Sequence, residues 1–215
     1  INILENGNKI ESTNTQVYLK NKGLYIESER VLYDKIVGKL ILDKNVKFID
    51  ELKDITVNTK SAIYSEKRNI LITKKATEIK IGNNYRILSK NLFYDRNLQK
   101  IYSSDETSII DLEGNVYNLE DNFTLNLSNE IISTNKLNII DIDNNIYSFE
   151  NAKINLGTKE IIGKELRIDF EDGYFGNPDN DPVLKGRSAL SNQNTTKIYK
   201  TVFSTCDTED KNCPG

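Results

Sequence analysis

The chain has 215 residues, and its 29 Lys and Arg against 32 Asp and Glu give a formal net charge of −3 at pH 7. It contains no His, which excludes a histidine general base, a Ser–His or Cys–His nucleophile pair and a His-containing zinc site. The two signs of charge are mixed along the chain without a basic cluster, which argues against nucleic-acid binding.

Residues 1–24 form the N-terminal edge segment of the predicted sheet. The stretches "KIESTNTQVYLK" and "GLYIES" favour strands at this end. The outermost strand of a sheet exposes unpaired N–H and C=O groups, which can pair with a strand of another chain. We assign this partner edge to Val17, Tyr18, Leu19, Leu24 and Ile26.

Residues 25–170 repeat one pattern about five times. Tyr33, Tyr64, Tyr94, Leu125 and Ile154 recur at intervals of 29 to 31 residues, each with another apolar residue two positions earlier. A period of two places both side chains on one face of a strand. Segments such as "SEKRN" and "DNN" supply turn residues between the strands. The pattern predicts an all-β array in which each copy buries the apolar face of its neighbour.

Two interpretations of the recurring apolar residues stay open. Aromatic and β-branched residues at a period of two are what any half-buried sheet requires, so each of them could simply be core. Alternatively, a long open sheet could enclose a trough with more apolar lining than packing needs. For the trough, we assign one wall to Tyr33, Tyr64, Leu92, Tyr94, Phe123, Leu125, Phe149 and Ile154, and the facing wall to Val46, Phe48, Ile79, Ile109 and Ile140.

The repeat ends after Phe170, and residues 171–203 are predicted to form a capping loop and a last strand, "TKIYKTVF". Asp179 and Asp181 suggest calcium, but the loop lacks the glycine and the terminal Glu of an EF-hand, so a solvated turn is favoured. The same interpretation applies to Asp141 and Asp143. We expect no metal, no other cofactor and no catalytic residue.

One copy of the repeat, "YIESERVLYDKIVGKLILDKNVKFID", has the form I-x-S/A-(D/E/K)-x-x-x-Y-D followed by G-K-L and N-V-x-F/I. It resembles the OstA-type domain of lipopolysaccharide transport, which occurs in the periplasmic bridge protein LptA and at the N-terminus of the outer-membrane translocon LptD. The segment "KGRSALSNQNTTKIYKTVFSTCDTEDKNCPG" is similar to the part of LptD that joins this domain to its β-barrel. The resemblance covers residues 25–215.

The resemblance implies an elongated two-sheet β-jellyroll, or β-taco, that carries the acyl chains of lipid A in its trough and is not an enzyme. The implied location is the periplasm of a Gram-negative bacterium, attached to the outer membrane through a C-terminal β-barrel absent from this chain. The implied partners are lipopolysaccharide, an LptA-like bridge protein that adds a strand at the N-terminal edge, the LptD β-barrel and an LptE-like lipoprotein.

Residues 204–215 would be the junction to that barrel, and they hold Cys206 and Cys213. In the oxidising periplasm that the resemblance implies, the two are candidates for a disulfide. A metal pair is the alternative, but two Cys without His make a poor zinc site.

Two other functions remain alternatives: a free-standing LptA-like bridge protein, and a β-solenoid adhesin or carbohydrate-binding domain. A carbohydrate-active domain would place paired carboxylates on one strand face. Here Asp and Glu lie mainly at turns or alternate outward, as in "ESER" and "DFED", which favours the transport proteins.

Overall fold

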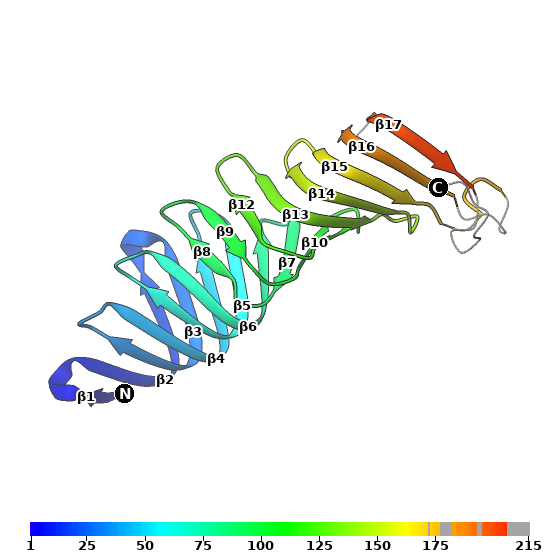
Figure 1. Ribbon diagram of the computed structural model, residues 1–215. Coiled ribbons are helices and arrows are strands. Elements are labelled where there is room, and N and C mark those ends of the chain that lie inside the picture. The colour runs from blue at the N-terminus through cyan, green and yellow to red at the C-terminus, as the bar shows by residue number, and fades with distance from the viewer. Residues whose placement is uncertain (172, 177–181, 193–194, 206–215) are drawn as a thin grey trace. The chain divides into compact units, whose positions relative to one another are not determined.

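In the computed structural model, which describes residues 1–171, 173–176, 182–192 and 195–205, the chain is all-β (Figure 1). Two short 3-10 helices, η1 (Glu5–Gly7) and η2 (Lys20–Lys22), accompany the strands. None of the helices in the described part of the chain is long and apolar enough to cross a membrane. The chain divides into two compact units, Ile1–Leu112 and Glu113–Gly215, and this division falls inside the segment 25–170.

The first unit is a series of antiparallel strands in which β2 to β6 each pair with the next strand along the chain. The strands are β1 (Asn2–Leu4), β2 (Lys9–Leu19), β3 (Leu24–Asp34), β4 (Lys39–Asp50), β5 (Ile55–Ser65), β6 (Ile70–Ile81), β7 (Tyr85–Ser89), β8 (Phe93–Asp95), β9 (Lys100–Ser103) and β10 (Thr107–Asp111). Alternation of apolar and polar residues gives each strand one buried face. In β5, for example, Ile55, Val57, Ala62 and Tyr64 are buried.

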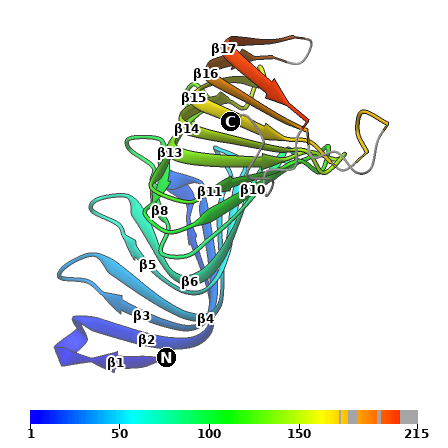
Figure 2. The ribbon, with the colours of Figure 1, turned by 45° about the vertical axis from the view of Figure 1, so that its right-hand side comes forward.

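The long strands of this unit bend near their middles (Figure 2). The pairing register shifts there, between Glu27 and Arg30 in β3 and between Asp43 and Val46 in β4. Lys44 and Asn45, inside the second shift, have φ of 61° and 49°, a left-handed conformation that L-residues adopt mainly where the chain must turn. Each long strand therefore contributes to two ladders.

The first ladder comprises residues 15–19, 24–27, 46–50, 55–59, 77–81, 85–89 and 108–111. The second ladder comprises residues 9–13, 30–34, 39–43, 61–65, 70–74, 93–95 and 100–102. The buried side of the first ladder faces the buried side of the second, because the Phe48 ring from the first lies 5.6 Å from the Tyr64 ring of the second, centroid to centroid. The core of this unit lies between the ladders.

Buried hydroxyl groups hold the bends of the first unit. Ser28 donates to the carbonyl oxygens of Arg30 and Asp43, at 2.9 Å each. Thr59 donates to the Ala76 carbonyl oxygen at 3.2 Å, and Ser103 donates to the Lys90 carbonyl oxygen at 3.0 Å. A bulge removes carbonyl groups from the regular ladder, and a buried carbonyl needs a partner. These side chains supply donors at the bends.

The second unit is also a series of antiparallel strands. They are β11 (Val116–Leu119), β12 (Phe123–Asn126), β13 (Ile131–Ile140), β14 (Ile146–Asn155), β15 (Glu160–Asp169), β16 (Val183–Ser191) and β17 (Thr196–Ser204). Both β11 and β12 pair with β13, and from β13 to β17 each strand pairs with the next. Asn151 in β14, Glu165 in β15 and Lys200 in β17 have positive φ. These strands therefore also carry a left-handed residue near their middles.

Candidate functional site

Most of the residues assigned from the sequence to an apolar interior lie in the cores of the two units. In the first unit, Val46, Phe48, Tyr64, Ile79, Leu92, Tyr94 and Ile109 are at most 2% exposed. In the second unit, Phe123, Leu125, Phe149 and Ile154 are buried. The two predicted walls correspond in the first unit to the two ladders: Tyr64 and Tyr94 lie in the second ladder, and Phe48, Ile79 and Ile109 lie in the first.

Two of the assigned residues lie elsewhere. Tyr33 is half-buried near the end of β3, where its hydroxyl donates to Glu66 at 3.1 Å. Ile140, assigned to a wall, instead points to the face of β13 opposite to Leu137 and Ile139, which are the buried residues there. A shift of one residue moves a side chain across a sheet, and the sequence spacing alone misplaced Ile140 by that one step.

The core of the first unit is filled by three rings from three strands. Phe48 lies 5.6 Å from Tyr64 and 6.4 Å from Tyr94, centroid to centroid, with an edge-on arrangement in the second pair. All three side chains are at most 1% exposed. Aromatic pairs at these distances contribute about 0.5–1.5 kcal/mol beyond their burial. In this structure the three residues are therefore closed core, and no water reaches them.

A buried polar cluster joins the same two ladders where their strands end. Asp50 closes β4 in the first ladder, and Arg96 follows β8 in the second. The Arg96 Nε donates to Asp50 Oδ2 at 2.6 Å, with side-chain exposures of 9% for Arg96 and 0% for Asp50. The Tyr94 hydroxyl donates to the same Asp50 oxygen at 2.6 Å. We call Asp50, Tyr94 and Arg96, with Asn69 and Tyr64, the Asp50 cluster.

The remaining donors of the Asp50 cluster are also paired. Arg96 donates from Nη1 to Asn69 Oδ1 at 3.0 Å and from Nη2 to the Lys22 carbonyl oxygen at 2.8 Å. The Tyr64 hydroxyl donates to the same Asn69 oxygen at 2.7 Å. Burial raises the pKa of Tyr64 to about 12, and burial together with the Asp50 carboxylate raises the pKa of Tyr94 further. Both phenols are therefore neutral donors at neutral pH.

Small residues let the core of the second unit close tightly. A Cβ at Gly163 in β15 would lie 2.4 Å from Phe149 Cδ1 of β14, so the Phe149 ring covers the backbone of Gly163. Gly186 in β16 is covered in the same way by Ile198 of β17, at 2.2 Å from the ideal Cβ. These contacts need glycine for its lack of a side chain.

The predicted partner edge maps onto two strands with different surroundings. Val17, Tyr18 and Leu19 lie in β2, which pairs with β3 along its length and with β1 at Lys9, Ile10 and Glu11. Within the first unit, no described strand pairs with the other edge of β2 from Ser12 to Leu19. Leu24 and Ile26, assigned to the same edge, lie instead in β3, which is paired on both sides by β2 and β4. The edge is therefore formed by residues 12–19 of β2.

Asp141 and Asp143 form a turn, and the Asp141 carboxylate is occupied by the chain itself. Its Oδ1 accepts the backbone N–H groups of Asp143 and Asn145, and its Oδ2 accepts the Tyr147 hydroxyl at 3.0 Å. No group of three or more possible metal ligands is present in the part of the chain that the structure describes. Asp179, Asp181, Cys206 and Cys213 lie outside the described residues.

Sequence reasoning assigned Tyr64 and Tyr94 to the interior, but it missed their polar partners in the Asp50 cluster and the hydroxyls at the bends. Asp50 and Arg96 are 46 residues apart and both stand next to turn residues, where a charged side chain is ordinarily solvated. The hydroxyls carry a usable signal, because Ser28 and Thr59 are 31 residues apart, which is the spacing of the apolar residues. A polar residue that keeps the period of the core indicates a buried position.

The described residues thus define an all-β protein of two units with apolar interiors, one buried ion pair and a free strand edge. No family model matches the chain, and no curated protein does. Among solved structures, the crystal structure of Kluyvelomyces marxianus Hsv2 is 9% identical, with 88% of this chain and 97% of that chain covered and a TM-score of 0.15. At that TM-score the likeness supports no conclusion about this chain.

Proposed function

We propose that the chain is an OstA-type domain of lipopolysaccharide export, a β-jellyroll of about five repeats that passes lipid A acyl chains along its interior. The proposed role is transport and not catalysis. The proposed location is the periplasm, at the N-terminal side of an LptD β-barrel with its LptE-like lipoprotein.

The observation that carries this proposal is the apolar interior between the two ladders of the first unit. Leu24, Leu42, Val57, Leu71 and Ile101 are at most 1% exposed, and they come from five different strands, β3, β4, β5, β6 and β9. Each CH₂ group that leaves water contributes about 0.8 kcal/mol. Because each strand contributes apolar side chains to this interior, an acyl chain would meet a similar environment at every strand. The lipid could therefore slide from one strand to the next.

The closed state of this core adds a requirement to the proposal. Phe48, Tyr64 and Tyr94 occupy the space between the ladders, so an acyl chain would enter only if the ladders separated. Separation would break the contact between Asp50 and Arg96 that joins them. We infer that an acyl chain would take the place of these rings between the ladders.

The free edge of β2 supports the second half of the proposal, which is strand addition by an LptA-like bridge protein. Within the first unit, no described strand pairs with this edge from Ser12 to Leu19, which is long enough for a strand of ordinary length. The Thr15 hydroxyl, on this strand, is buried without a hydrogen-bond partner. Backbone pairing with an incoming strand would continue the ladder.

Photo-crosslinking in cells tests the proposal. A benzoyl-phenylalanine at Phe48 or Phe123 replaces a buried apolar ring by a larger ring inside the interior of its unit and should capture lipopolysaccharide. The same group at Lys90, which is exposed at a bend, or at Glu27, on the outer face of β3, is the matched control. Equal capture at interior and control positions, or none at any position, would contradict the proposal.

A further inference from the structure

The outer faces of the two ladders in the first unit differ in chemistry. On the first ladder, a row of directly opposed residues is mostly polar and consists of Gln16, Glu27, Lys47, Asn58, Glu78, Leu88 and Ser108. On the second ladder, the corresponding row begins at Glu11 and is then apolar, with Leu32, Ile41, Ile63, Ile72, Phe93 and Tyr102. The outer face of a half-buried sheet is ordinarily polar. The second ladder therefore carries an apolar row, which we call the outer row, where packing of the core does not need one.

The outer row is accessible and ordered by its own contacts. Ile41 is 42% exposed, and the other members are half-buried. The rings of Phe93 and Tyr102 stack at 5.0 Å with an interplanar angle of 2°. Strands are spaced about 4.7–4.9 Å apart, so the part of the row from Ile41 on β4 to Tyr102 on β9 spans about 19 Å.

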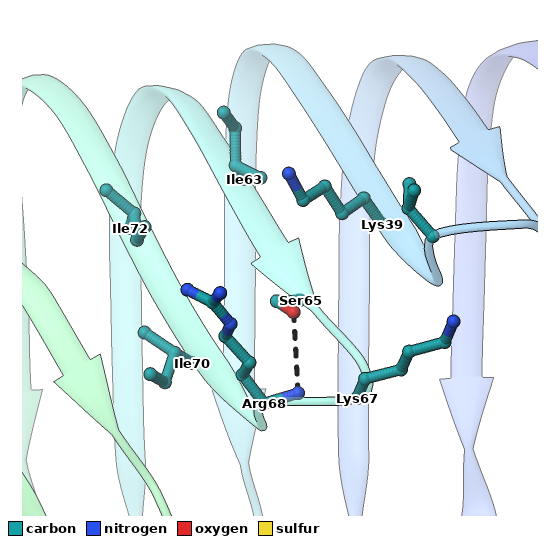
Figure 3. A pocket seen from close by; sticks show the side chains of 8 residues that line it. Lys39, Ile63, Ser65, Lys67, Arg68, Ile70 and Ile72 are labelled. Atoms are coloured by element: carbon teal, nitrogen blue, oxygen red, sulfur yellow. Dashed lines mark hydrogen bonds between the residues drawn. The ribbon is translucent and has the colours of Figure 1, made fainter.

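Cations border this row beside a shallow pocket of about 440 Å³, a volume within the range of about 300–1,000 Å³ found for ligand sites. The pocket is lined by Val37, Lys39, Ile63, Ser65, Lys67, Arg68, Ile70 and Ile72. Figure 3 shows Lys39 extending toward Ile63 and Arg68 lying beside Ile70, whereas Lys67 points away from them. The floor is apolar and the margin is cationic.

None of these three cations forms an ion pair among the described residues, although Lys67 is held by a carbonyl group. Lys67 donates from Nζ to the Ile36 carbonyl oxygen at 2.8 Å. Lys39 and Arg68 take part in none of the ion pairs that the described residues form. Asp34 is opposite Lys39 in the ladder, but its Oδ1 accepts the backbone N–H groups of Ile36 and Val37. The guanidinium of Arg68 and the ammonium of Lys39 can therefore receive an anion.

We propose that this outer surface binds an anionic amphiphile whose phosphate head group lies between Lys39 and Arg68 and whose acyl chain lies along the outer row. A phosphate accepts paired hydrogen bonds from a guanidinium, and the isoleucine floor removes the first methylenes of the chain from water. The site is on the opposite side of the second ladder from the core, so the inference stands independently of the proposed transport along the interior.

Calorimetric titration of the full chain with dodecyl phosphate, below its micelle concentration, tests this inference. Each buried CH₂ contributes roughly fourfold in affinity, so octyl phosphate should bind on the order of 100-fold more weakly. Dodecyl maltoside, which has the same chain and a neutral head, should bind at least tenfold more weakly. Inorganic phosphate, which has no chain, should bind more weakly than octyl phosphate.

Matched variants locate the site. The double variant Lys39→Gln/Arg68→Gln should weaken dodecyl phosphate binding at least tenfold, and Ile63→Thr/Ile72→Thr should weaken it comparably. Lys47→Gln removes a cation from the same strand as Lys39 but on the outer face of the first ladder, and should leave the affinity unchanged. Circular dichroism checks that each variant keeps its strands.

Four results would overturn the inference. The inference is wrong if the wild-type protein does not bind dodecyl phosphate. It is also wrong if the protein binds dodecyl maltoside as tightly as dodecyl phosphate. If both double variants bound dodecyl phosphate normally while Phe48→Ala bound it more weakly, the ligand would bind in the core, as the proposed function requires. A dimer in sedimentation that Ile63→Thr/Ile72→Thr dissociates would make the outer row a contact between copies of this chain.

Discussion

Asp50 is a carboxylate with no exposed surface, and its charge is balanced by a single guanidinium. The transfer of such a pair from water into protein costs several kcal/mol per ion, which only good geometry and complete hydrogen bonding offset. Arg96 and Tyr94 meet these two conditions, because each donates a hydrogen bond of 2.6 Å to Asp50. The Asp50 cluster therefore depends on every member, and losing one leaves the others buried without a partner.

We expect Asp50→Asn to lower the free energy of unfolding by about 3–5 kcal/mol, because the Arg96 cation would remain buried without a counter-charge. Urea unfolding measures this as a lower midpoint with an unchanged slope. The control is Glu78→Gln, which removes a carboxylate 3.2 Å from Arg86 in a partly exposed pair and should cost less than about 1 kcal/mol.

The apolar double variant Asp50→Leu/Arg96→Met should recover much of this loss, since replacing both ions removes the desolvation cost along with the attraction. If Asp50→Asn lost no more stability than Glu78→Gln, the Asp50 cluster would not be holding the ladders together.

The phenols of the cluster predict how stability depends on alkaline pH. Burial raises the pKa of Tyr64 from 10.0 to about 12, so the fold favours the neutral phenol. That contribution is complete below pH 10 and is lost as the pH rises toward about 12, because the unfolded chain releases its proton first. Urea unfolding at several pH values should show stability falling across this window. Tyr64→Phe should reduce the slope of the fall, and an unchanged slope would contradict the prediction.

At the scale of the strand, the sequence indicated where strands run and which face is apolar, because a period of two is visible in any single copy. It did not indicate the bends, because the residues with positive φ there, Lys44, Asn45 and Lys75, are not glycines, and glycine is the residue that predicts such a conformation. Nor did it separate an edge strand from an interior one. Val17 and Ile26 have the same local pattern, and only the pairing of β3 with β4 distinguishes them.

A proline scan distinguishes these two strands. Proline removes a backbone donor, so in β2 some positions between Ser12 and Leu19 should keep the fold and abolish binding of an LptA-like partner, because their N–H groups point away from β3. Proline at Ile26, in the doubly paired β3, should unfold the first unit. Circular dichroism separates the two effects. Partner binding that survives in every folded variant would place the contact on another element.

At the scale of the molecule, the all-β class followed from the repeated turn residues and the absence of any helical period. The division after Leu112 did not follow, because the apolar residues keep their spacing across it. The repeated pattern also could not decide between core and trough: Phe48, Tyr64 and Tyr94 would show the same spacing in either case. Only the distances between their rings show that the described interior is closed.

The division predicts that residues 1–112 fold by themselves. Their core between the ladders and the Asp50 cluster lie wholly within this segment. The fragment should show a β-type circular dichroism spectrum, unfold cooperatively in urea, and lose about the same stability on Asp50→Asn as the full chain does. A fragment without cooperative unfolding would show that the first unit needs the rest of the chain.

The pairing of β2 to β6 in chain order bears on the kinetics of the fold. Each hairpin closes a short loop, so the ladder can grow strand by strand as the chain leaves the ribosome. The contact between Asp50 and Arg96 spans 46 residues and cannot form until β8 is in place. Interactions that form after the rate-limiting step change the rate of unfolding more than the rate of folding. The ion pair would then determine how long a folded molecule survives, while the hairpins determine how quickly it forms.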